Sequence, residues 1–286
     1  MKFHFIAAEN ANHCFDVKFM CRELEVSTSG YYAYTKRGIS QRKRDDLALI
    51  PLIHAEFRKH PRGCGSRMVV GALRACGHAV SRKRVVRLMS NENLRHRLKR
   101  RFVHIRPSSA EKRVAHNVLD RSFAVGQPNK IWASDITCLH TRSGWAYLAA
   151  VLDLGSRKVV GWKVGPTMEE SLVLGALHKA IEQRTPAPGL IHHSDRGRQY
   201  ASHAYQRLLR EHHMVCSMSQ PANCWDNACV ESFFSTLKFE CGNRSPFRSR
   251  SAARSEVADY ILTFYNPTRL HSYLGYRSPM EFERAV

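Results

Sequence analysis

The sequence predicts an all-α region followed by an α/β domain, in which helices cover both faces of a mixed five-stranded sheet. Up to about residue 94, short segments with apolar residues at helical spacing are separated by turns. From residue 130, three apolar runs joined by tight turns predict an antiparallel meander. Helices then alternate with two further strands, and this alternation completes the mixed sheet.

The all-α region contains two predicted helix-turn-helix units. The first has helices over residues 16–25 and 31–36 with a turn between them. In the second, helices over residues 44–59 and 66–76 precede a helix that is capped by Ser81. Two helices joined by a glycine-containing turn are only a moderate signal, so DNA binding needs support from charge.

The helix after Ser81 is the candidate recognition helix. Val85, Leu88 and Met89 fall on its inward face at helical spacing. Its basic side chains stay available to phosphate groups or base edges. They are Arg82, Lys83, Arg84 and Arg87. An ordinary amphipathic helix with a solvated basic face is the alternative.

The charge distribution points to a nucleic-acid partner. The net charge is +21; residues 1–130 hold 27 Lys and Arg against 10 Asp and Glu, whereas residues 131–286 hold 18 against 14. Such an excess serves mainly to neutralise phosphates. A solvated, solubility-giving surface is the alternative, but balanced charge would serve that purpose as well. We therefore expect the first half to grip DNA, with the dense basic run 95–106 lying along the DNA backbone.

The α/β domain follows a regular order of elements. Strands are expected over residues 131–139, 145–154, 158–164, 190–195 and 214–219. Helices are expected over residues 169–183, 202–212, 225–241 and 250–265.

Nothing in the sequence predicts a membrane partner. The start of the chain lacks the continuous apolar region of a signal peptide, and no window approaches the about 18 apolar residues of a membrane span. We expect a cytoplasmic protein that is associated with the nucleoid when it is bound to DNA. The nine cysteines are scattered and odd in number, so we expect reduced thiols.

Three acidic residues of the α/β domain need an explanation. Asp135 interrupts an apolar strand, where an unpaired carboxylate is costly to bury. Asp195 ends the fourth strand before the Gly197 loop, and ligands of α/β sheets collect at such strand ends. Glu231 lies in a predicted helix, with 35 residues between it and Asp195.

The helix around Glu231 has two faces at 100° per residue. The apolar arc holds Cys229, Val230, Phe233, Phe234 and Leu237. The polar arc holds Asn227, Glu231, Ser235 and Lys238. An amide, a carboxylate and a cation would thus share one face, where a metal ion and a phosphodiester could meet them. For this helix taken alone, a solvated polar face is the alternative.

Four ordered motifs resemble those of a known family. WASDIT, HHSDRGRQY and NCWDNACVESFFSTLK carry the three acids, with a 35-residue gap and a Lys seven positions after the Glu, as in the retroviral-integrase-like DDE superfamily. YNPTRLHSYLGYRSPMEF is similar to the closing motif of bacterial insertion-sequence transposases, the second-reading-frame products of the copy-and-paste type. VSTSGYYAYTKR and SRKRVVRLM resemble the helix-turn-helix region of that group. The resemblance covers nearly the whole chain.

The resemblance implies an RNase H-like fold and a DDE polynucleotidyl transferase. It makes Asp135, Asp195 and Glu231 both the catalytic residues and the ligands of two Mg²⁺ ions, with Mn²⁺ as a substitute. The enzyme would nick the ends of an insertion sequence and join them to target DNA by two-metal transesterification. Among the neighbouring residues, Lys238 and Asn227 are expected to bind DNA. Arg198, beside Asp195, is expected to add a phosphate contact.

The expected domain boundaries combine pattern and resemblance. A helical region over 1–60 is followed by a second helix-turn-helix-like region over 61–106 and a linker over 107–128. The integrase catalytic core with its C-terminal helices occupies 129–286. The resemblance also implies a homo-oligomer on DNA, and either a partnership or a fusion with an upstream-frame helix-turn-helix protein.

Departures from the family pattern touch no expected metal ligand. Cys64-Gly65 stands where Tyr-Gly is usual, and Gln220-Pro221-Ala222 stands where a basic residue and Gly are common. Two rival functions stay open at this point. One is a DNA-binding regulator with a structural RNase H-like domain, and the other is a hydrolytic nuclease of the same fold.

Several neighbours of the three acids have open roles. Asp153 is a fourth acid of the strand region, and capping its turn or pairing with Arg157 is expected of it rather than metal binding. His193 could orient Asp195 or contact substrate, although a hydrogen-bonded structural histidine is commoner. Arg269 and His271 could contact DNA or fix the C-terminal turn.

Overall fold

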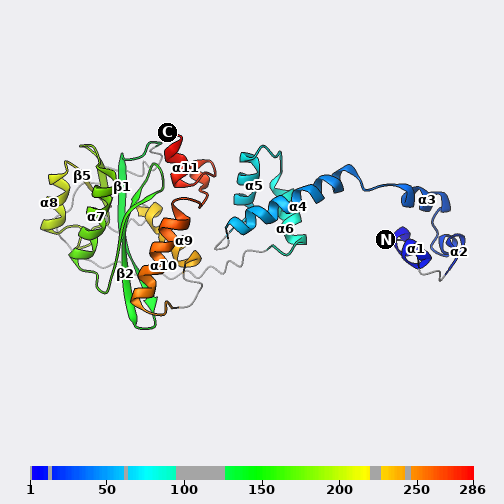
Figure 1. The fold of residues 1–286 in the computed structure, drawn as a ribbon, viewed down its shortest axis with the longest axis horizontal. Coiled ribbons are helices and arrows are strands. Elements are labelled where there is room, and N and C mark those ends of the chain that lie inside the picture. The colour runs from blue at the N-terminus through cyan, green and yellow to red at the C-terminus, as the bar shows by residue number, and fades with distance from the viewer. Residues whose placement is uncertain (1, 12–14, 61–63, 95–125, 220–226, 242–245) are drawn as a thin grey trace.

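The computed structural model describes residues 2–11, 15–60, 64–94, 126–219, 227–241 and 246–286. Figure 1 shows two helical units followed by a domain built on a twisted sheet. The expected linker over 107–128 and the basic run 95–106 lie almost wholly outside the described residues. No helix in the described ranges is long and apolar enough to cross a membrane.

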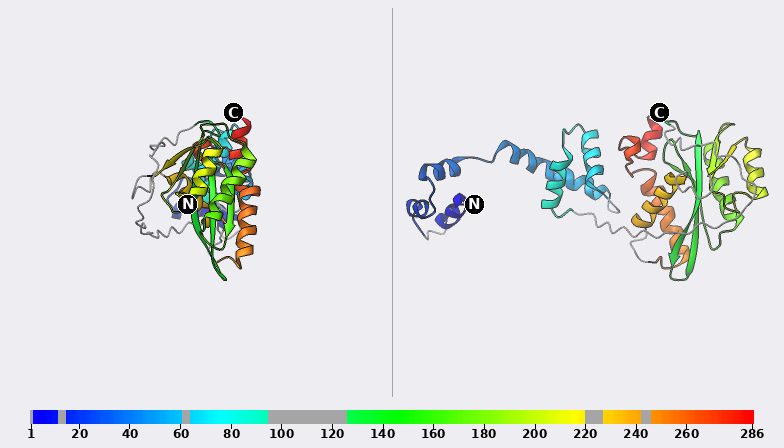
Figure 2. Two further views of the ribbon diagram at one scale, coloured as in Figure 1. Left: turned by 90° about the vertical axis from the view of Figure 1, so that its left-hand side faces the viewer. Right: turned by 180° about the vertical axis from the view of Figure 1, so that it is seen from behind.

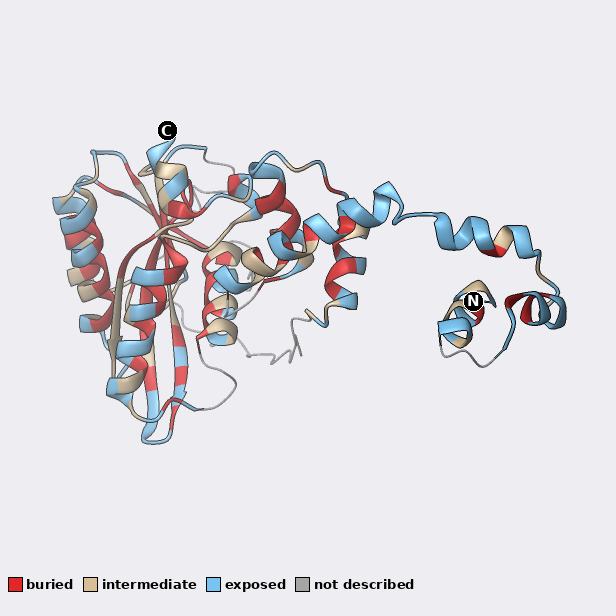
Figure 3. Cartoon of the chain, turned by 45° about the vertical axis from the view of Figure 1, so that its right-hand side comes forward, coloured by how far each residue is buried: buried red, intermediate tan, exposed pale blue. Residues whose placement is uncertain are grey.

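The first helical unit comprises α1 (Lys2–Ala11), α2 (Val17–Glu23) and α3 (Thr28–Lys36). Two of these helices are capped at the N-terminus by a side chain. The Asp16 carboxylate accepts hydrogen bonds from backbone amides in the first turn of α2, and the Ser27 hydroxyl accepts one in the first turn of α3. The apolar core is small, and it consists of Ile6, Val17, Met20, Cys21 and Tyr31. Most of the other residues of this unit are exposed (Figure 3).

The second helical unit comprises α4 (Gln41–Lys59), α5 (Ser66–Ala75) and α6 (Arg82–Asn91). The Ser81 hydroxyl caps α6 as expected, a contact that contributes about 1 kcal/mol in typical helices. Leu49 and Ile53 of α4 pack in one core with apolar residues of α5 and α6. The unit therefore begins at α4, whereas the expected boundary was at residue 60. Tertiary packing assigns α4 to a unit, and helical periodicity alone cannot.

The sheet has the strand order β3-β2-β1-β4-β5. Its members are β1 (Ile131–Thr141), β2 (Gly144–Asp153), β3 (Val159–Gly165), β4 (Ile191–Ser194) and β5 (Val215–Met218). The first three strands are antiparallel, and β4 and β5 run parallel to β1. The predicted mixed sheet is confirmed.

Helices cover both faces of the sheet, as Figures 1 and 2 show. On one face, α7 (Glu170–Arg184) and α8 (His203–Glu211) share a core with Trp132. On the other face, α9 (Ala228–Glu240), α10 (Arg250–Asp259) and the π-helix η2 (Tyr260–Tyr265) share a core with Ala133 and Leu139. Side chains alternate between the two faces along a strand, and Asp135 lies two positions after Ala133. Asp135 is therefore on the face of the sheet that α9 covers.

The C-terminal segment connects the second helical unit with the sheet domain. This segment contains the short helices η3 (Ser272–Leu274) and α11 (Pro279–Arg284). Tyr276 lies directly against Gly71 of α5, where any Cβ would collide with the tyrosine ring. The His60 ring also meets the Phe264 ring edge-on, with 6.0 Å between ring centroids. The absence of a side chain at Gly71 is therefore what permits this close packing.

Candidate active site

The two aspartates lie at the same level on neighbouring strands. β1 and β4 are parallel, and Ser134 is the register partner of Ser194. Asp135 and Asp195 each follow those serines by one position, so the register brings them side by side at the ends of the β4 pairing. This is the carboxyl edge of the parallel part of the sheet, where ligands of α/β folds collect.

Backbone amides orient both aspartates. The Ile136 N–H donates to Asp135 Oδ1 at 2.7 Å, and the Gly197 N–H donates to Asp195 Oδ1 at 2.9 Å. A Cβ at Gly197 would lie 2.9 Å from the same Asp195 oxygen, so a larger residue would crowd the carboxylate. Each aspartate is thus held through one oxygen.

α9 presents Glu231 to the face of the sheet that carries Asp135. Val230, Phe233, Phe234 and Leu237 of α9 are buried against the sheet, as the apolar arc predicted. Glu231 and Lys238 remain exposed. The two charged residues therefore lie on the open side of the helix, as expected for groups that meet a ligand.

The position of Asn227 differs from the expected one. It precedes α9 with a non-helical φ of −117°, so the 100° step does not apply to it. Its side chain is 5% exposed, and Nδ2 donates to the Ser134 carbonyl at 3.2 Å. This contact anchors the start of α9 to β1 beside Asp135. Asn227 is thus largely buried in this structure, and its expected contact with DNA stays a prediction.

The three carboxylates repel one another electrostatically. Burial, together with the negative charges of Asp195 and Glu231, raises the pKa of Asp135 to about 8. Burial also raises the pKa values of Asp195 and Glu231. Lys238 partly offsets the effect at Asp135, but no cation of the described residues forms an ion pair with any of the three. The site therefore has uncompensated negative charge.

The donor chemistry suits a divalent cation. Three carboxylates from three elements supply hard oxygen ligands, which Mg²⁺ and Mn²⁺ prefer. Within the described ranges, no three metal-binding side chains are gathered tightly enough to hold an ion as they stand.

Two buried histidines lie behind the carboxylates. His192 contacts the Ser134 hydroxyl at 2.9 Å and the Tyr205 hydroxyl at 3.1 Å through the same ring nitrogen. His193 is fully buried, and its two ring nitrogens lie within hydrogen-bond distance of the Ser217 and Ser219 hydroxyls. His193 therefore fits the structural role that was the commoner alternative.

Asp153 has the turn-capping role that the sequence favoured. Its carboxylate accepts hydrogen bonds from the backbone amides of Asn129, Gly155 and Ser156. The Arg184 guanidinium also lies 3.8 Å from this carboxylate. The Asp153 carboxylate is thus occupied by the fold.

Arg269 serves the C-terminal segment. Its guanidinium donates to both carboxylate oxygens of Glu240 at 3.0–3.1 Å. The His271 ring stacks edge-on against Tyr265, and burial lowers its pKa to about 3. Both residues fix the chain after η2, which resolves the even choice that the sequence left open.

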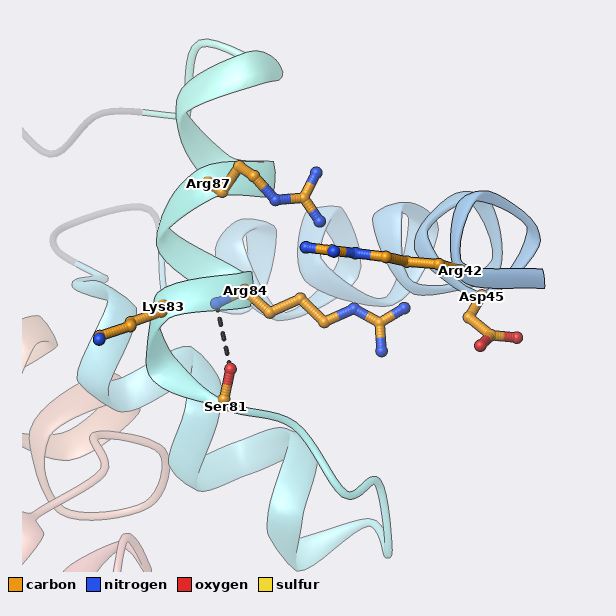
Figure 4. A pocket seen from close by; sticks show the side chains of 6 residues that line it. All are labelled: Arg42, Asp45, Ser81, Lys83, Arg84 and Arg87. Carbon is orange, nitrogen blue, oxygen red and sulfur yellow. Dashed lines mark hydrogen bonds between the residues drawn. The ribbon is translucent and has the colours of Figure 1, made fainter. Parts of the chain in front are cut away.

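The basic residues of α6 fall into two classes. Arg82 and Lys83 are exposed, as expected for phosphate contacts. Arg84 Nε and an Arg87 amino group each donate at 2.6 Å to Asp46 of α4. Figure 4 shows Lys83, Arg84 and Arg87 along a shallow hollow between α4 and α6. Arg84 and Arg87 are thus anchored by Asp46, an acid about forty positions earlier in the sequence, and their contact with DNA stays a prediction.

Arg198 is exposed in the loop that follows Asp195, in a position open to a phosphate. The Gln220-Pro221-Ala222 departure lies outside the described residues. Cys64 is buried in the core of the second helical unit, and burial raises the pKa of its thiol to about 12. The Cys64 substitution thus fills a core position of that unit.

Comparisons with known proteins agree with this architecture. Two models of an integrase core domain match residues 126–224 and 212–279, and a model of an HTH-like domain matches residues 43–102. The transposase InsF for insertion sequence IS3A of Escherichia coli (strain K12) is 39% identical over 285 residues, covering 99% of this chain and 98% of the relative.

A second relative and one solved structure extend the comparison. An uncharacterized 31 kDa protein of insertion element IS600 from Shigella sonnei is 38% identical, covering 92% of this chain and 97% of the relative. The simian T-cell lymphotropic virus intasome, solved with PP2A regulatory subunit B56 gamma, contains a chain that is 17% identical with a TM-score of 0.45. That likeness covers 77% of this chain and 70% of the other. The full-length identity and the integrase core match show that the chain belongs to the insertion-sequence transposases, which are polynucleotidyl transferases of the DDE type.

Proposed function

We propose that Asp135, Asp195 and Glu231 bind two Mg²⁺ ions, for which Mn²⁺ can substitute, and form the catalytic site of the transposase. The single observation that carries the proposal is the convergence of three uncompensated carboxylates from β1, the end of β4 and α9. Structural acids elsewhere in the domain are satisfied by the protein, as Asp153 and Glu240 are. A set of carboxylates that is left unpaired at the edge of a sheet is typical of a metal site.

The proposed reaction is the nicking of insertion-sequence ends followed by their joining to target DNA. Bound divalent cations would activate the attacking oxygen and stabilise the leaving 3′-oxygen. In the joining step, a bond forms between the 3′-oxygen of the element and a target phosphorus while the target P–O3′ bond breaks. One phosphodiester replaces another, so no ATP is needed.

Residues around the carboxylates would position the DNA. Lys238 lies on the open side of α9 and is close enough to Asp135 to influence its pKa. Arg198 is exposed beside Asp195. These two cations would neutralise phosphate oxygens on either side of the reacting phosphorus. Asn227 acts indirectly, by holding the start of α9 on β1.

DNA recognition is assigned to the second helical unit. Arg82 and Lys83 are exposed at the start of α6, whose apolar side is buried in the unit. A helix with this arrangement can enter a groove or lie along a phosphate backbone. We propose a homo-oligomer that brings two DNA ends together, and an upstream-frame helix-turn-helix protein as partner or fusion. Because DNA is the substrate, the site of action is the bacterial cytoplasm, on the nucleoid.

A strand-transfer assay tests the proposal. Labelled duplexes that carry the ends of the element are incubated with full-length protein and MgCl₂. Asp195→Asn should lower joining by more than about a hundredfold, since even indirect supports of metal ligands contribute 10–100-fold. Glu182→Gln removes the same charge at an exposed site on α7 and should leave joining unchanged.

The products separate the possible functions. Joined strands support the transposase, and cleavage without joining supports a hydrolytic nuclease. The absence of both products supports a DNA-binding regulator. If Asp195→Asn joined DNA at the wild-type rate, the assignment of the carboxylates would be wrong.

A further inference from the structure

The hollow between α4 and α6 gathers more positive charge than the protein neutralises. Its lining consists of Arg42, Asp45, Ser81, Lys83, Arg84 and Arg87. Figure 4 shows the guanidinium groups of Arg42, Arg84 and Arg87 pointing into the same space. Asp45 points away from them, and its carboxylate accepts from the Gln41 amide at 2.7 Å.

Asp46 holds two of these guanidinium groups in place. Its side chain is largely buried near the N-terminal end of α4. Oδ1 accepts a 2.6 Å hydrogen bond from Arg84, and Oδ2 accepts a 2.6 Å hydrogen bond from Arg87. These hydrogen bonds lower the pKa of Asp46, that from Arg87 most and that from Arg84 next. The carboxylate therefore stays ionised throughout the neutral pH range, and both contacts persist there.

The three guanidinium groups retain unused donors. Each arginine has five N–H groups in a fixed planar arrangement. One buried amino group of Arg84 has no hydrogen-bond partner among the described residues. Arg42 forms no ion pair within the described part of the chain. Three cations thus face one carboxylate, and their free donors match the oxygens of a phosphate group.

We infer that this hollow is a binding site for a DNA backbone phosphate, and that Asp46 fixes Arg84 and Arg87 in the orientation that receives it. The inference rests on the proposed DNA-binding function of the second helical unit. Arg42 would close the site from α4, so the phosphate would bridge two helices. A contact to a phosphate carries no base sequence and instead sets the register of α6 on the duplex.

The direction in which loss of Asp46 changes DNA affinity distinguishes an orienting role from simple electrostatics. Removing a negative charge from a DNA-binding face should strengthen binding through the overall field. If Asp46 orients the two arginines, its removal should weaken binding instead. Asp45 is the matched control, because it lines the same hollow but, within the described part of the chain, forms no ion pair with either arginine.

The experiment compares full-length Asp46→Asn and Asp45→Asn by fluorescence anisotropy. The probe is a labelled mixed-sequence duplex of about 30 base pairs, or roughly three helical turns. EDTA is present to prevent cleavage, and KCl is varied. We expect Asp46→Asn to bind about 3- to 10-fold more weakly than wild type, and Asp45→Asn to bind as tightly as wild type or more tightly.

A second variant keeps the test decisive if Asp46→Asn unfolds the helical unit, which a thermal melt would reveal. Arg42→Gln leaves the Asp46 contacts intact and should reduce the slope of log K against log salt by about one phosphate contact, or roughly 0.9. Arg207→Gln removes the same charge on exposed α8 and should not change the slope.

The outcomes separate this inference from the proposed function. If wild type binds the duplex but Asp46→Asn binds as tightly as Asp45→Asn, the inference is overturned and the DNA-binding proposal stands. A wild-type salt slope in Arg42→Gln overturns the inference in the same way. If wild-type protein does not bind the duplex at all, the DNA-binding proposal itself fails.

Discussion

Asp46 in the second helical unit and Asp135 in the sheet domain show opposite uses of a carboxylate. Two arginines donate hydrogen bonds to Asp46 and lower its pKa. Among the described residues, the Ile136 backbone amide donates a hydrogen bond to Asp135, and burial with two neighbouring acids raises its pKa to about 8. The protein supplies the counter-charge where an acid supports the fold. At Asp135 no described residue supplies a counter-charge through an ion pair, and we propose that a bound cation does so.

Helix α9 contains both kinds of acid. Glu231 near its start is exposed and forms no ion pair with a described residue. Glu240 at its end is 5% exposed at the side chain and binds the Arg269 guanidinium through both oxygens. The difference therefore follows the role of the residue and not the domain in which it lies.

The largest expected effect is on the structural acid of α9. Glu240→Gln should lower the free energy of unfolding by about 3 kcal/mol, because it leaves the Arg269 charge largely buried without a partner. Urea denaturation followed by circular dichroism measures this change. Glu211→Gln breaks the exposed pair with Arg207 and should change stability by less than about 1 kcal/mol. Equal effects of the two variants would contradict the distinction between the buried and the exposed ion pair.

The next effect has the opposite sign. Asp135→Asn should raise the free energy of unfolding in EDTA by about 2 kcal/mol at pH 8, because the folded protein no longer has to accommodate the carboxylate. The folded pKa of about 8 exceeds the value of 3.8 for an unperturbed aspartate. Wild-type stability without metal should therefore fall as pH rises from about 4 to about 8, and the variant should lack this slope.

A pH series of urea denaturation curves in EDTA measures the effect. Asp16→Asn provides a contrast, because the Asp16 carboxylate caps α2 and its loss should destabilise the fold. A destabilised Asp135→Asn would show that this carboxylate is structural, like Asp46.

The smallest effect separates position from charge. Asn227→Ala removes the hydrogen bond to the Ser134 carbonyl while leaving all three carboxylates in place. We expect joining to slow about tenfold, or about 1.4 kcal/mol, with unchanged affinity for duplex DNA. Ser235→Ala, on the exposed side of the same helix, is the control. Single-turnover joining and anisotropy measure the two quantities, and a wild-type joining rate would exclude a positioning role.

Local patterns in the sequence predicted most of the fold. The meander, the alternation that follows it and the Ser81 cap all depend on neighbours within a few positions. The apolar arc of α9 was predicted in the same way, because Val230, Phe233 and Leu237 repeat at helical spacing. The three acids were selected by their placement in these elements and by a family resemblance.

Contacts between distant segments could not be predicted in this way. The boundary before α4 depends on packing against α5 and α6. The anchoring of Arg84 and Arg87 depends on Asp46, which lies 38 and 41 positions earlier in the sequence. Asn227 was placed on the polar face because the helix was assumed to include it, whereas α9 begins one residue later. The first two features depend on a partner that is far away in the sequence. The third depends on the exact residue at which a helix begins.

The contact between Gly71 and Tyr276 has a consequence for protein synthesis. The ribosome adds Tyr276 about two hundred residues after Gly71, and long after all three carboxylates have been made. A polypeptide that stops between residues 231 and 276 would contain the helical units and all three acids but could not form this contact. In such a product the Tyr276 ring would be missing from its place against α5. The complete packing of the second helical unit therefore requires translation as far as residue 276.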